Sequence, residues 1–360
     1  MSKVIPLAYP ILLFLDGYFV HPYGSFKATG DVYLGLATFF MFLIIFIMFK
    51  STRYFSRHMV LLYILLLVPI LSSPKSLLYC TSYFLHILFA FLVLNRYKEN
   101  DLTRLLYRLL LTYIIISVVV YLQRGLNYNW NFLRLRGGFN IWGGSPLLGT
   151  ILLFRIVSLI QGKFDDYKHL DWLFVVLSLA YISRSGIFLS AIYIISRIKL
   201  RRAYMFILPL VFWRNISGGL LHDLGQLISM RMGSDDVLGE RSLLWKQIPN
   251  ILFEQPLGVG YAGFQSYSDY SSAHNLTLNI VLEFGLIFGL VFIVYICYLV
   301  VVAISNCKVN KKLLILYLMA FFVISHTSGF KIIQTNGYIS AIQLWFLFAM
   351  IPLQKSGEVL

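Results

Sequence analysis

The sequence predicts an all-α, polytopic integral membrane protein of about twelve transmembrane helices, forming a single transmembrane domain over residues 1–360. Three observations predict this class. Hydrophobic residues make up 59% of the chain and charged residues 12%, about half the charged fraction of a soluble domain. Apolar runs of about 18 or more residues recur from end to end. Most basic residues lie in short loops beside these runs, as expected for topology signals.

The expected transmembrane helices follow the apolar runs. Several are short for a ~30 Å hydrocarbon core and must tilt little, break or lie beside thinned bilayer. The run 276–304 is long and contains Gly285 and Gly289. No small-residue cleavage site follows the first run, so we expect it to be retained. The expected spans are 4–15, 32–49, 59–71, 77–94, 105–122, 142–160, 170–182, 187–197, 203–213, 276–304, 313–326 and 339–353.

The basic residues predict an orientation. With the N-terminus inside, 18 Lys and Arg residues fall in inside loops and 11 in outside loops, which favours cytoplasmic N- and C-termini. Arg155 falls within a span, near its inner end, where it can snorkel. The net charge of +15 does not indicate nucleic acid, because no basic tract is interleaved with aromatics outside the spans. The three cysteines predict no disulfide framework.

One outside connection is too long to be a turn. Residues 214–275 separate two expected spans, and long loops are usually functional or disordered. This segment carries several apolar residues between 243 and 253. We therefore expect an ordered, helical periplasmic loop that packs on the membrane face.

Arginine dominates the outside charge, and its guanidinium group binds phosphate through two parallel hydrogen bonds. Arg134 and Arg136 precede paired glycines, an arrangement that lets backbone and guanidinium approach an anion together; a plain interfacial anchor explains them equally well. Arg184 lies in Ser-Arg-Ser-Gly between two nearly continuous spans. A charge at that depth is costly unless it faces a cavity or a partner, which favours function.

A third arginine, Arg241, precedes Trp245 by four residues, so the two share one face of an expected helix. Trp245 then either anchors at the interface or stacks on Arg241. Three glycines follow in Pro-Leu-Gly-Val-Gly-Tyr-Ala-Gly, at 258, 260 and 263. They permit close backbone approach to a bulky polar ligand, or serve turn chemistry alone.

A His-Asn pair, His274 and Asn275, opens the long run 276–304. An imidazole just outside the hydrocarbon is placed to act on a molecule that arrives from the bilayer; alternatively it is an ordinary helix-capping loop residue. Glu283 lies nine residues further on, on the opposite face of any helix that includes His274. We therefore do not pair the two, and we expect a structural hydrogen bond for Glu283.

These sites, in this order, resemble the O-antigen polymerase and ligase superfamily of bacterial inner-membrane glycosyltransferases. The resemblance covers about residues 134–305. Its elements are Arg136-Gly-Gly-Phe, Ser183-Arg-Ser-Gly, Arg241-Ser-Leu-Leu-Trp, Pro256-Leu-Gly-Val-Gly, and His274-Asn with the delayed Gly285. Phe288 departs from the signature, which usually has a small or short branched residue there. The first 130 residues and the last 50 match in hydropathy alone.

The resemblance implies a GT-C-like fold and transfer of a glycan from a polyprenyl-pyrophosphate donor to a lipid-linked acceptor, at the periplasmic face of the inner membrane. It implies that Arg184 and Arg241 bind the pyrophosphate, with Arg136 as a weaker candidate. His274 would be the base for the acceptor hydroxyl or its orienter. Asn275, Glu283, Trp245 and Arg134 are supporting candidates. No acidic cluster demands a metal, and we expect no cofactor.

The expected partners are the lipid-linked donor and acceptor, the bilayer and a chain-length regulator, with no nucleic acid. A polymerase joins one lipid-linked glycan to another repeat unit, whereas a ligase joins the glycan to lipid A-core in lipopolysaccharide biosynthesis. The modest length and the outside segment favour the polymerase over the ligase. A polysaccharide transporter or flippase is the alternative of a different class, but transporters need a charged route and symmetry between halves. The anion-binding candidates lie on one face, which favours an enzyme.

Overall fold

The computed structural model describes residues 57–73, 81, 84, 85, 88, 103–115, 118, 144–180, 184–197, 241–261, 263–268, 273, 275–306 and 310–327. All regular structure in these ranges is helical. The elements are α3 (Arg57–Leu71), α6 (Gly144–Ile160), the 3₁₀ turn η2 (Asp165–Tyr167), α7 (His169–Ala180), α8 (Arg184–Arg197), α11 (Arg241–Glu254), the 3₁₀ turn η4 (Gly263–Ser266), α12 (Leu276–Asn306) and α13 (Lys311–Thr327).

The expectation of about twelve transmembrane helices is wrong. Among the described residues one helix, over Leu276–Val302 in α12, is long and apolar enough to cross a membrane. Helices do lie near the expected positions 59–71, 142–160, 170–182, 187–197 and 313–326, but they contain 12 to 17 residues. At 1.5 Å per residue they reach about 18–26 Å, less than a ~30 Å hydrocarbon core.

Several expected spans cannot be compared in this way. Those at 4–15, 32–49, 203–213 and 339–353 lie outside the described residues. The span expected at 77–94 is described at four positions, and the one expected at 105–122 is helical over 103–115 and at 118. In the most apolar 18-residue stretch of α12, 22% of the residues are buried. The core helix of a soluble protein would be mostly buried, so this value favours association with a membrane.

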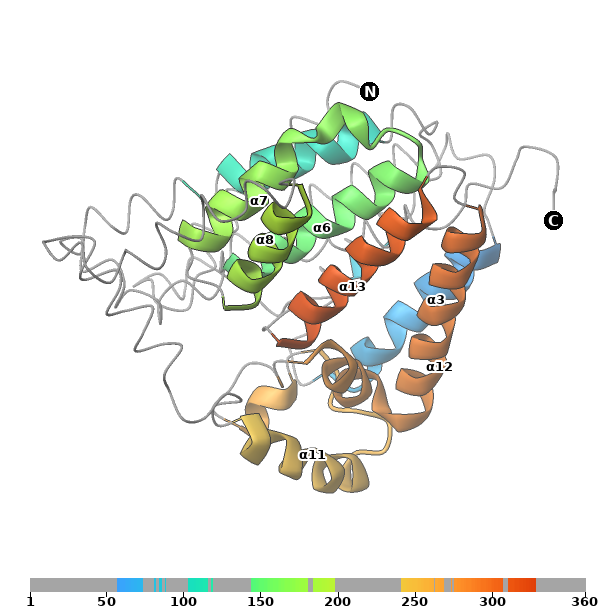
Figure 1. Cartoon of the computed structure of the whole chain (residues 1–360). Coiled ribbons are helices and arrows are strands. Elements are labelled where there is room, and N and C mark those ends of the chain that lie inside the picture. The colour runs from blue at the N-terminus through green and yellow to red at the C-terminus, as the bar shows by residue number, and fades with distance from the viewer. Residues whose placement is uncertain are drawn as a thin grey trace, which may run out of the picture.

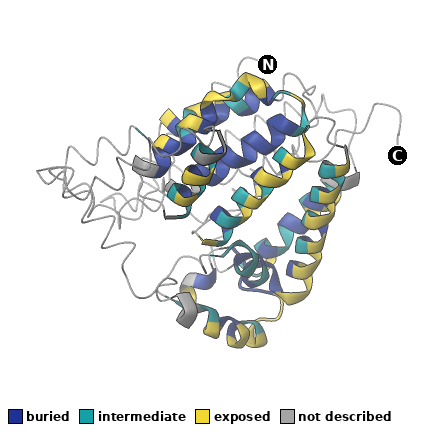
Figure 2. Ribbon diagram, viewed as in Figure 1, coloured by how far each residue is buried: buried dark blue, intermediate teal, exposed yellow. Residues whose placement is uncertain are grey.

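Helix α6 is the centre of the bundle. Every side chain from Leu147 to Leu159 is buried, as expected for a helix that is apolar on all faces. It packs against α7 and α13, and α8 packs against α7 and α13 in turn. Figure 1 shows these four helices as one group, with α12 beside α3 and α11 below them. In Figure 2 the exposed residues of α12 and α13 form outward stripes, which include Ile287, Val294, Val301, Met319 and Phe322.

Helix α12 is broken at Gly285, whose φ of 77° and ψ of 170° are not helical. The break gives a first arm over 276–284 and a second arm over 286–306. The second arm alone, 21 residues long, reaches about 32 Å. The arms approach closely, because a Cβ added to Gly289 would lie 2.9 Å from the Cα of Val281. The glycines at 285 and 289 thus lie at a sharp turn between the two arms of α12.

Candidate functional site

The residues around position 274 are held by hydrogen bonds from several elements. The indole Nε1 of Trp245, on α11, donates to the carbonyl of Ala273 at 2.8 Å. The amide of Ala273 donates to Oδ1 of Asn279 at 2.8 Å. Ala273 is completely buried, so these two bonds satisfy both of its backbone groups. The expectation that Trp245 anchors at the interface or stacks on Arg241 stays a prediction, because the side chain of Arg241 lies outside the described part of the chain.

The start of α12 is fixed by its own cap and by α13. Oδ1 of Asn275 accepts a hydrogen bond from the amide of Leu278 at 3.1 Å, the usual role of an N-cap asparagine. Oγ1 of Thr277 lies 2.7 Å from Nε2 of His326, in the last turn of α13. We call Trp245, Ala273, Asn275, Thr277, Asn279 and His326 the entrance cluster.

His274 itself lies outside the described residues, as do Arg134 and Arg136. Its neighbours Ala273 and Asn275 belong to the entrance cluster. Arg184 is the first residue of α8 and Arg241 the first residue of α11, and the structure describes their backbones and not their side chains. Sequence reasoning missed Thr277 and His326, although a histidine at the end of an apolar helix is a recognisable signal.

These helix ends gather at one end of the bundle. Gly186 in α8 lies against Ser178 near the end of α7 and Leu148 near the start of α6. His326 near the end of α13 meets Thr277 at the start of α12. Helix α13 packs along α6 and α8. In Figure 1 the starts of α6, α8 and α12 lie toward the same end of the bundle as the ends of α7 and α13. Trp245 joins α11 to the start of α12 through Ala273. We call this end of the bundle the entrance end.

The glycine loop after α11 closes onto the break in α12. The amides of Val259 and Gly260 donate to the carbonyls of Leu282 and Glu283 at 2.8 and 3.2 Å. A continuous helix would occupy those carbonyls itself, so the loop satisfies acceptors that the break at Gly285 frees. A Cβ on Gly258 would lie 2.2 Å from the nitrogen of Gly285, and one on Gly285 would lie 2.4 Å from the carbonyl of Pro256.

Gly258 and Gly260 thus take part in a backbone-to-backbone junction with Gly285 and Ser73, which we call the glycine seam. Gly260 closes in the same way on Ser73 after α3. Beside it, the buried hydroxyl of Tyr261 donates to the carbonyl of Leu66. Burial raises the pKa of Tyr261 well above its ordinary value, and the nearby Glu283 carboxylate raises it further. Glu283 is buried on the first arm, 6% exposed.

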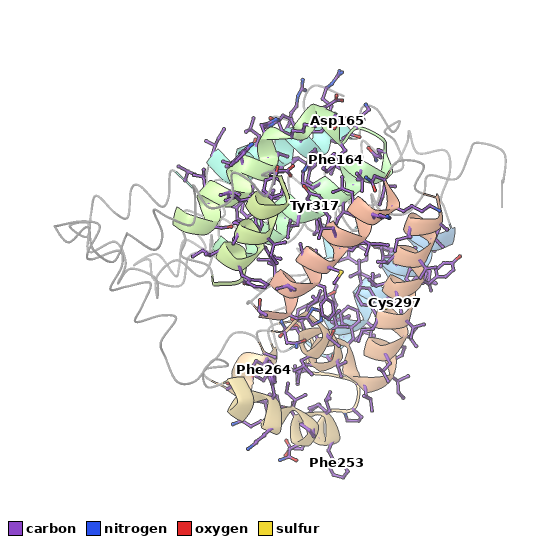
Figure 3. The ribbon with its side chains drawn as sticks, in the orientation of Figure 1. Phe164, Asp165, Phe253, Phe264, Cys297 and Tyr317 are labelled. Carbon is purple, nitrogen blue, oxygen red and sulfur yellow. The ribbon has the colours of Figure 1, made fainter. Side chains whose placement is uncertain are left out.

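Figure 3 shows how side chains pack at the two ends of the bundle: Phe264 beside α11, Tyr317 and Phe164 near the opposite end. Ile248, Ile251, Val259, Phe264, Ala273 and Leu282 form a small core between α11, the glycine loop and the first arm. This core holds α11 against α12. Within the segment expected at 214–275, the described part includes α11 and η4. Residues 214–240 lie outside the described residues, and the periplasmic position of the segment stays a prediction.

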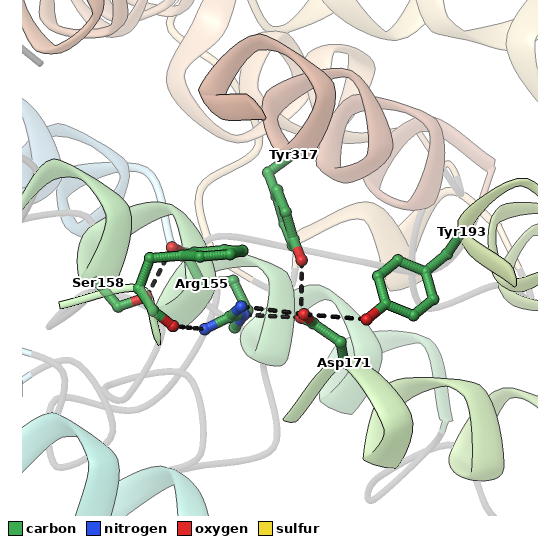
Figure 4. A network of polar contacts seen from close by, with 6 residues as sticks. Arg155, Ser158, Asp171, Tyr193 and Tyr317 are labelled. Atoms are coloured by element: carbon green, nitrogen blue, oxygen red, sulfur yellow. Dashed lines mark hydrogen bonds and ion pairs between the residues drawn. The ribbon is translucent and has the colours of Figure 1, made fainter. Parts of the chain in front are cut away.

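The opposite end of the bundle holds a buried ion-pair cluster. Arg155 donates to Asp171 through Nε at 2.7 Å and Nη2 at 3.0 Å, and through Nη1 to the carbonyl of Phe164 at 2.8 Å. The hydroxyls of Tyr317 and Tyr193 donate to the same carboxylate at 2.7 and 3.3 Å, as Figure 4 shows.

Arg155 is completely buried and Asp171 is 4% exposed. The guanidinium also lies 3.6 Å from the ring centre of Phe164. The expectation that Arg155 snorkels out of its helix is therefore wrong. A guanidinium with a bidentate carboxylate partner has no need to reach water.

The pKa of the histidine in the entrance cluster is shifted. Burial lowers the pKa of His326 below its ordinary value, and the weaker effect of its bond to the Phe322 carbonyl raises it. Among the described residues no group of three or more His, Cys, Asp and Glu side chains is arranged to hold a metal ion. The entrance cluster offers hydroxyl, amide and imidazole groups.

Comparison with known proteins adds no relatives: no family model, no curated protein and no solved structure matches the chain.

Proposed function

We propose that the protein is a metal-independent glycosyltransferase that polymerises O-antigen or a related surface polysaccharide. It would join oligosaccharide repeat units carried on polyprenyl pyrophosphate. One observation carries the proposal. Arg184 and Arg241 begin α8 and α11, and the residues on both sides of His274 lie at the start of α12. Figure 1 shows the starts of these helices toward the same end of the bundle.

A pyrophosphate leaving group suits this end of the molecule. Helix N-termini present unpaired amides and a partial positive charge, which attract phosphate. An arginine that begins such a helix adds a fixed full charge. Stabilising the departing pyrophosphate in this way lowers the barrier at the anomeric carbon without a metal. We assign this role to Arg184 and Arg241, with Arg136 as a weaker candidate.

His274 then lies where an acceptor hydroxyl meets the donor, as base or orienter. Trp245, Asn275 and the Asn279 amide oxygen hold the chain on either side of it. We further propose that the protein works as a multi-pass protein of the bacterial inner membrane, with cytoplasmic termini and a periplasmic site. The apolar length of α12 supports a membrane location.

The test is transfer by purified protein from a synthetic polyprenyl-pyrophosphate repeat unit, with and without EDTA. We expect polymer in both conditions. Arg184→Lys and Arg241→Lys should each lose most of the activity, because a lysine cannot make the forked contact. Lys246→Arg, an exposed change on α11, is the matched control and should be near normal. Full activity in both lysine variants would remove the phosphate-binding role.

Gene deletion separates this proposal from the ligase. Single-repeat caps on lipid A-core are expected after loss of a polymerase. Full-length polymer that accumulates on the carrier lipid would instead identify a ligase. Unchanged surface glycan, with no transfer in vitro, would contradict both.

A further inference from the structure

The imidazole of His326 is held in one tautomer. Its Nδ1 lies 2.9 Å from the carbonyl oxygen of Phe322, which accepts hydrogen bonds and cannot donate them. Nδ1 therefore carries the proton. In the neutral ring Nε2 then presents a lone pair. This lone pair faces Oγ1 of Thr277 at 2.7 Å, so the threonine hydroxyl donates to it.

Thr277 keeps acceptor capacity after this bond. A hydroxyl has one proton to donate and two lone pairs, so Oγ1 can accept a hydrogen bond from a second hydroxyl while it donates to His326. Both side chains are half-buried, so neither is sealed in the core. Thr277 follows position 274 by three residues, a chain length that reaches at most about 11 Å.

Helix dipoles decide which histidine better holds a proton. His326 lies in the last turn of α13, where the negative end of the dipole stabilises a cation. Position 274 precedes the start of α12, where the positive end opposes one. The helix ends therefore favour a proton on His326 over one at position 274, and this effect acts against the burial that lowers the pKa of His326.

Among the residues that the structure describes, the other groups that contact the His326 ring are neutral. From α13 these are Ser325, whose Oγ lies 3.1 Å from Nδ1, and the ring of Phe322, stacked at 3.9 Å between centroids. From α12 it is Thr277. Within the described residues no carboxylate or cation contacts the ring. Within the described part of the chain, burial and the hydrogen bond to the Phe322 carbonyl shift the pKa of His326.

We propose that Thr277 and His326 form a proton relay for the acceptor hydroxyl. The proposal rests on the proposed glycan transfer and specifies its base. The acceptor hydroxyl gives its proton to Oγ1 of Thr277 while the proton on Oγ1 passes to Nε2 of His326. The acceptor oxygen forms a bond to the anomeric carbon, and the bond to pyrophosphate breaks with its electron pair. His326, now imidazolium, returns its proton to solvent, and His274 orients the acceptor.

The first test compares kcat and KM for transfer in three variants. Thr277→Val keeps the shape and removes the hydroxyl, and should lower kcat about a hundredfold, within the usual range for general-base loss. Its KM for the lipid-linked donor should change little, because the arginines remain. Thr277→Ser should restore most of kcat. His326→Gln should lower kcat as Thr277→Val does.

The pH profile of kcat separates a relay from a structural contact. In the wild type kcat should fall at low pH as His326 becomes protonated. This acid limb should vanish in His326→Gln and persist in His274→Gln. Thr112→Val is the control, because Thr112 donates to the carbonyl of Arg108 in its own helix. A Thr277→Val kcat close to wild type, or an acid limb retained in His326→Gln, would overturn the relay.

A second readout needs no activity. In ¹⁵N-histidine NMR at neutral pH, the Nε2 of His326 should be unprotonated in the wild type, and its resonance should shift in Thr277→Val. A protonated Nε2 would overturn the relay. Wild-type protein that transfers no glycan but gives the expected spectrum would reject the proposed function. Protein that transfers glycan but shows a protonated Nε2 would reject the relay alone.

Discussion

The two polar clusters of the bundle differ in charge and in how far their side chains are buried. The buried ion-pair cluster joins two full charges, and the carboxylate of Asp171 also accepts from two tyrosines. The entrance cluster has neutral groups, and its Thr277–His326 pair is half-buried. The two lie nine residues apart along α13, from Tyr317 to His326, or about 14 Å. The sealed ion pair is suited to join helices, whereas the open neutral pair is suited to exchange a proton.

The largest expected effect comes from breaking the ion pair. Arg155→Met leaves Asp171 buried without its cation, and this should lower the free energy of unfolding by about 3–5 kcal/mol. The measurement is denaturant unfolding in detergent, with helix content as the signal. The double change Arg155→Met with Asp171→Leu should recover much of the loss, because no uncompensated charge stays buried.

The control for this prediction is the exposed pair of Lys168 and Asp165, whose side chains are 58% and 80% exposed. Lys168→Met should change stability by less than about 1 kcal/mol. A loss from Arg155→Met no larger than that of the control would mean that Asp171 finds another partner. The closed cluster would then not be what joins α6 to α7.

The glycine seam tests how the entrance end is supported. Gly285→Ala combines a backbone conformation that costs about 1–3 kcal/mol outside glycine with a Cβ 2.4 Å from the Pro256 carbonyl. We expect a loss of at least that size, together with loss of transfer, because the first arm carries Thr277. Gly162→Ala is the control: its φ of 69° is also left-handed, but it lies after α6, so transfer by the folded protein should persist.

A change at Trp245 should have a smaller effect on stability and still test the role of the entrance end. Trp245→Phe keeps the aromatic ring and removes the donor to the Ala273 carbonyl, so stability should fall by about 1–2 kcal/mol. Transfer should fall about ten- to hundredfold, since a small misplacement next to the reacting groups has such effects. Lys246→Ala, exposed on the same helix, should change neither. Normal transfer in Trp245→Phe would show that the bond to Ala273 serves folding alone.

The sequence was sufficient to predict those helices that follow from a local apolar pattern. Apolar runs predicted helices close to where α6, α7, α12 and α13 lie, and the four-residue spacing put Arg241 and Trp245 on one face. Hydropathy did not predict the number of membrane-spanning helices. Helices of 12 to 17 residues have the apolar composition of a membrane helix but are too short to cross the bilayer.

The pairings could not be predicted, because they join residues that are distant in sequence. Arg155 meets Asp171 across a turn between two helices, and Thr277 meets His326 from 49 positions away. The glycines at 258 and 285 were recognisable as a pattern. A glycine that contacts another backbone and a glycine that contacts a ligand look the same in a sequence, so the pattern did not show which contact they make. The predicted roles of His274, Arg134 and Arg136 stay predictions.

The smallest effect gives the cleanest comparison between the ends. Asn275 and Asn310 cap α12 and α13 with the same geometry, each Oδ1 accepting a backbone amide at 3.1 Å. Replacing either with alanine removes one cap bond and should cost about 1 kcal/mol. Equal stability losses are therefore expected from thermal unfolding. Transfer should fall in Asn275→Ala alone, because this cap holds the turn between position 274 and Thr277, whereas Asn310 lies at the opposite end of α13. Equal activities in two equally destabilised variants would show that the entrance end has no special part in the reaction.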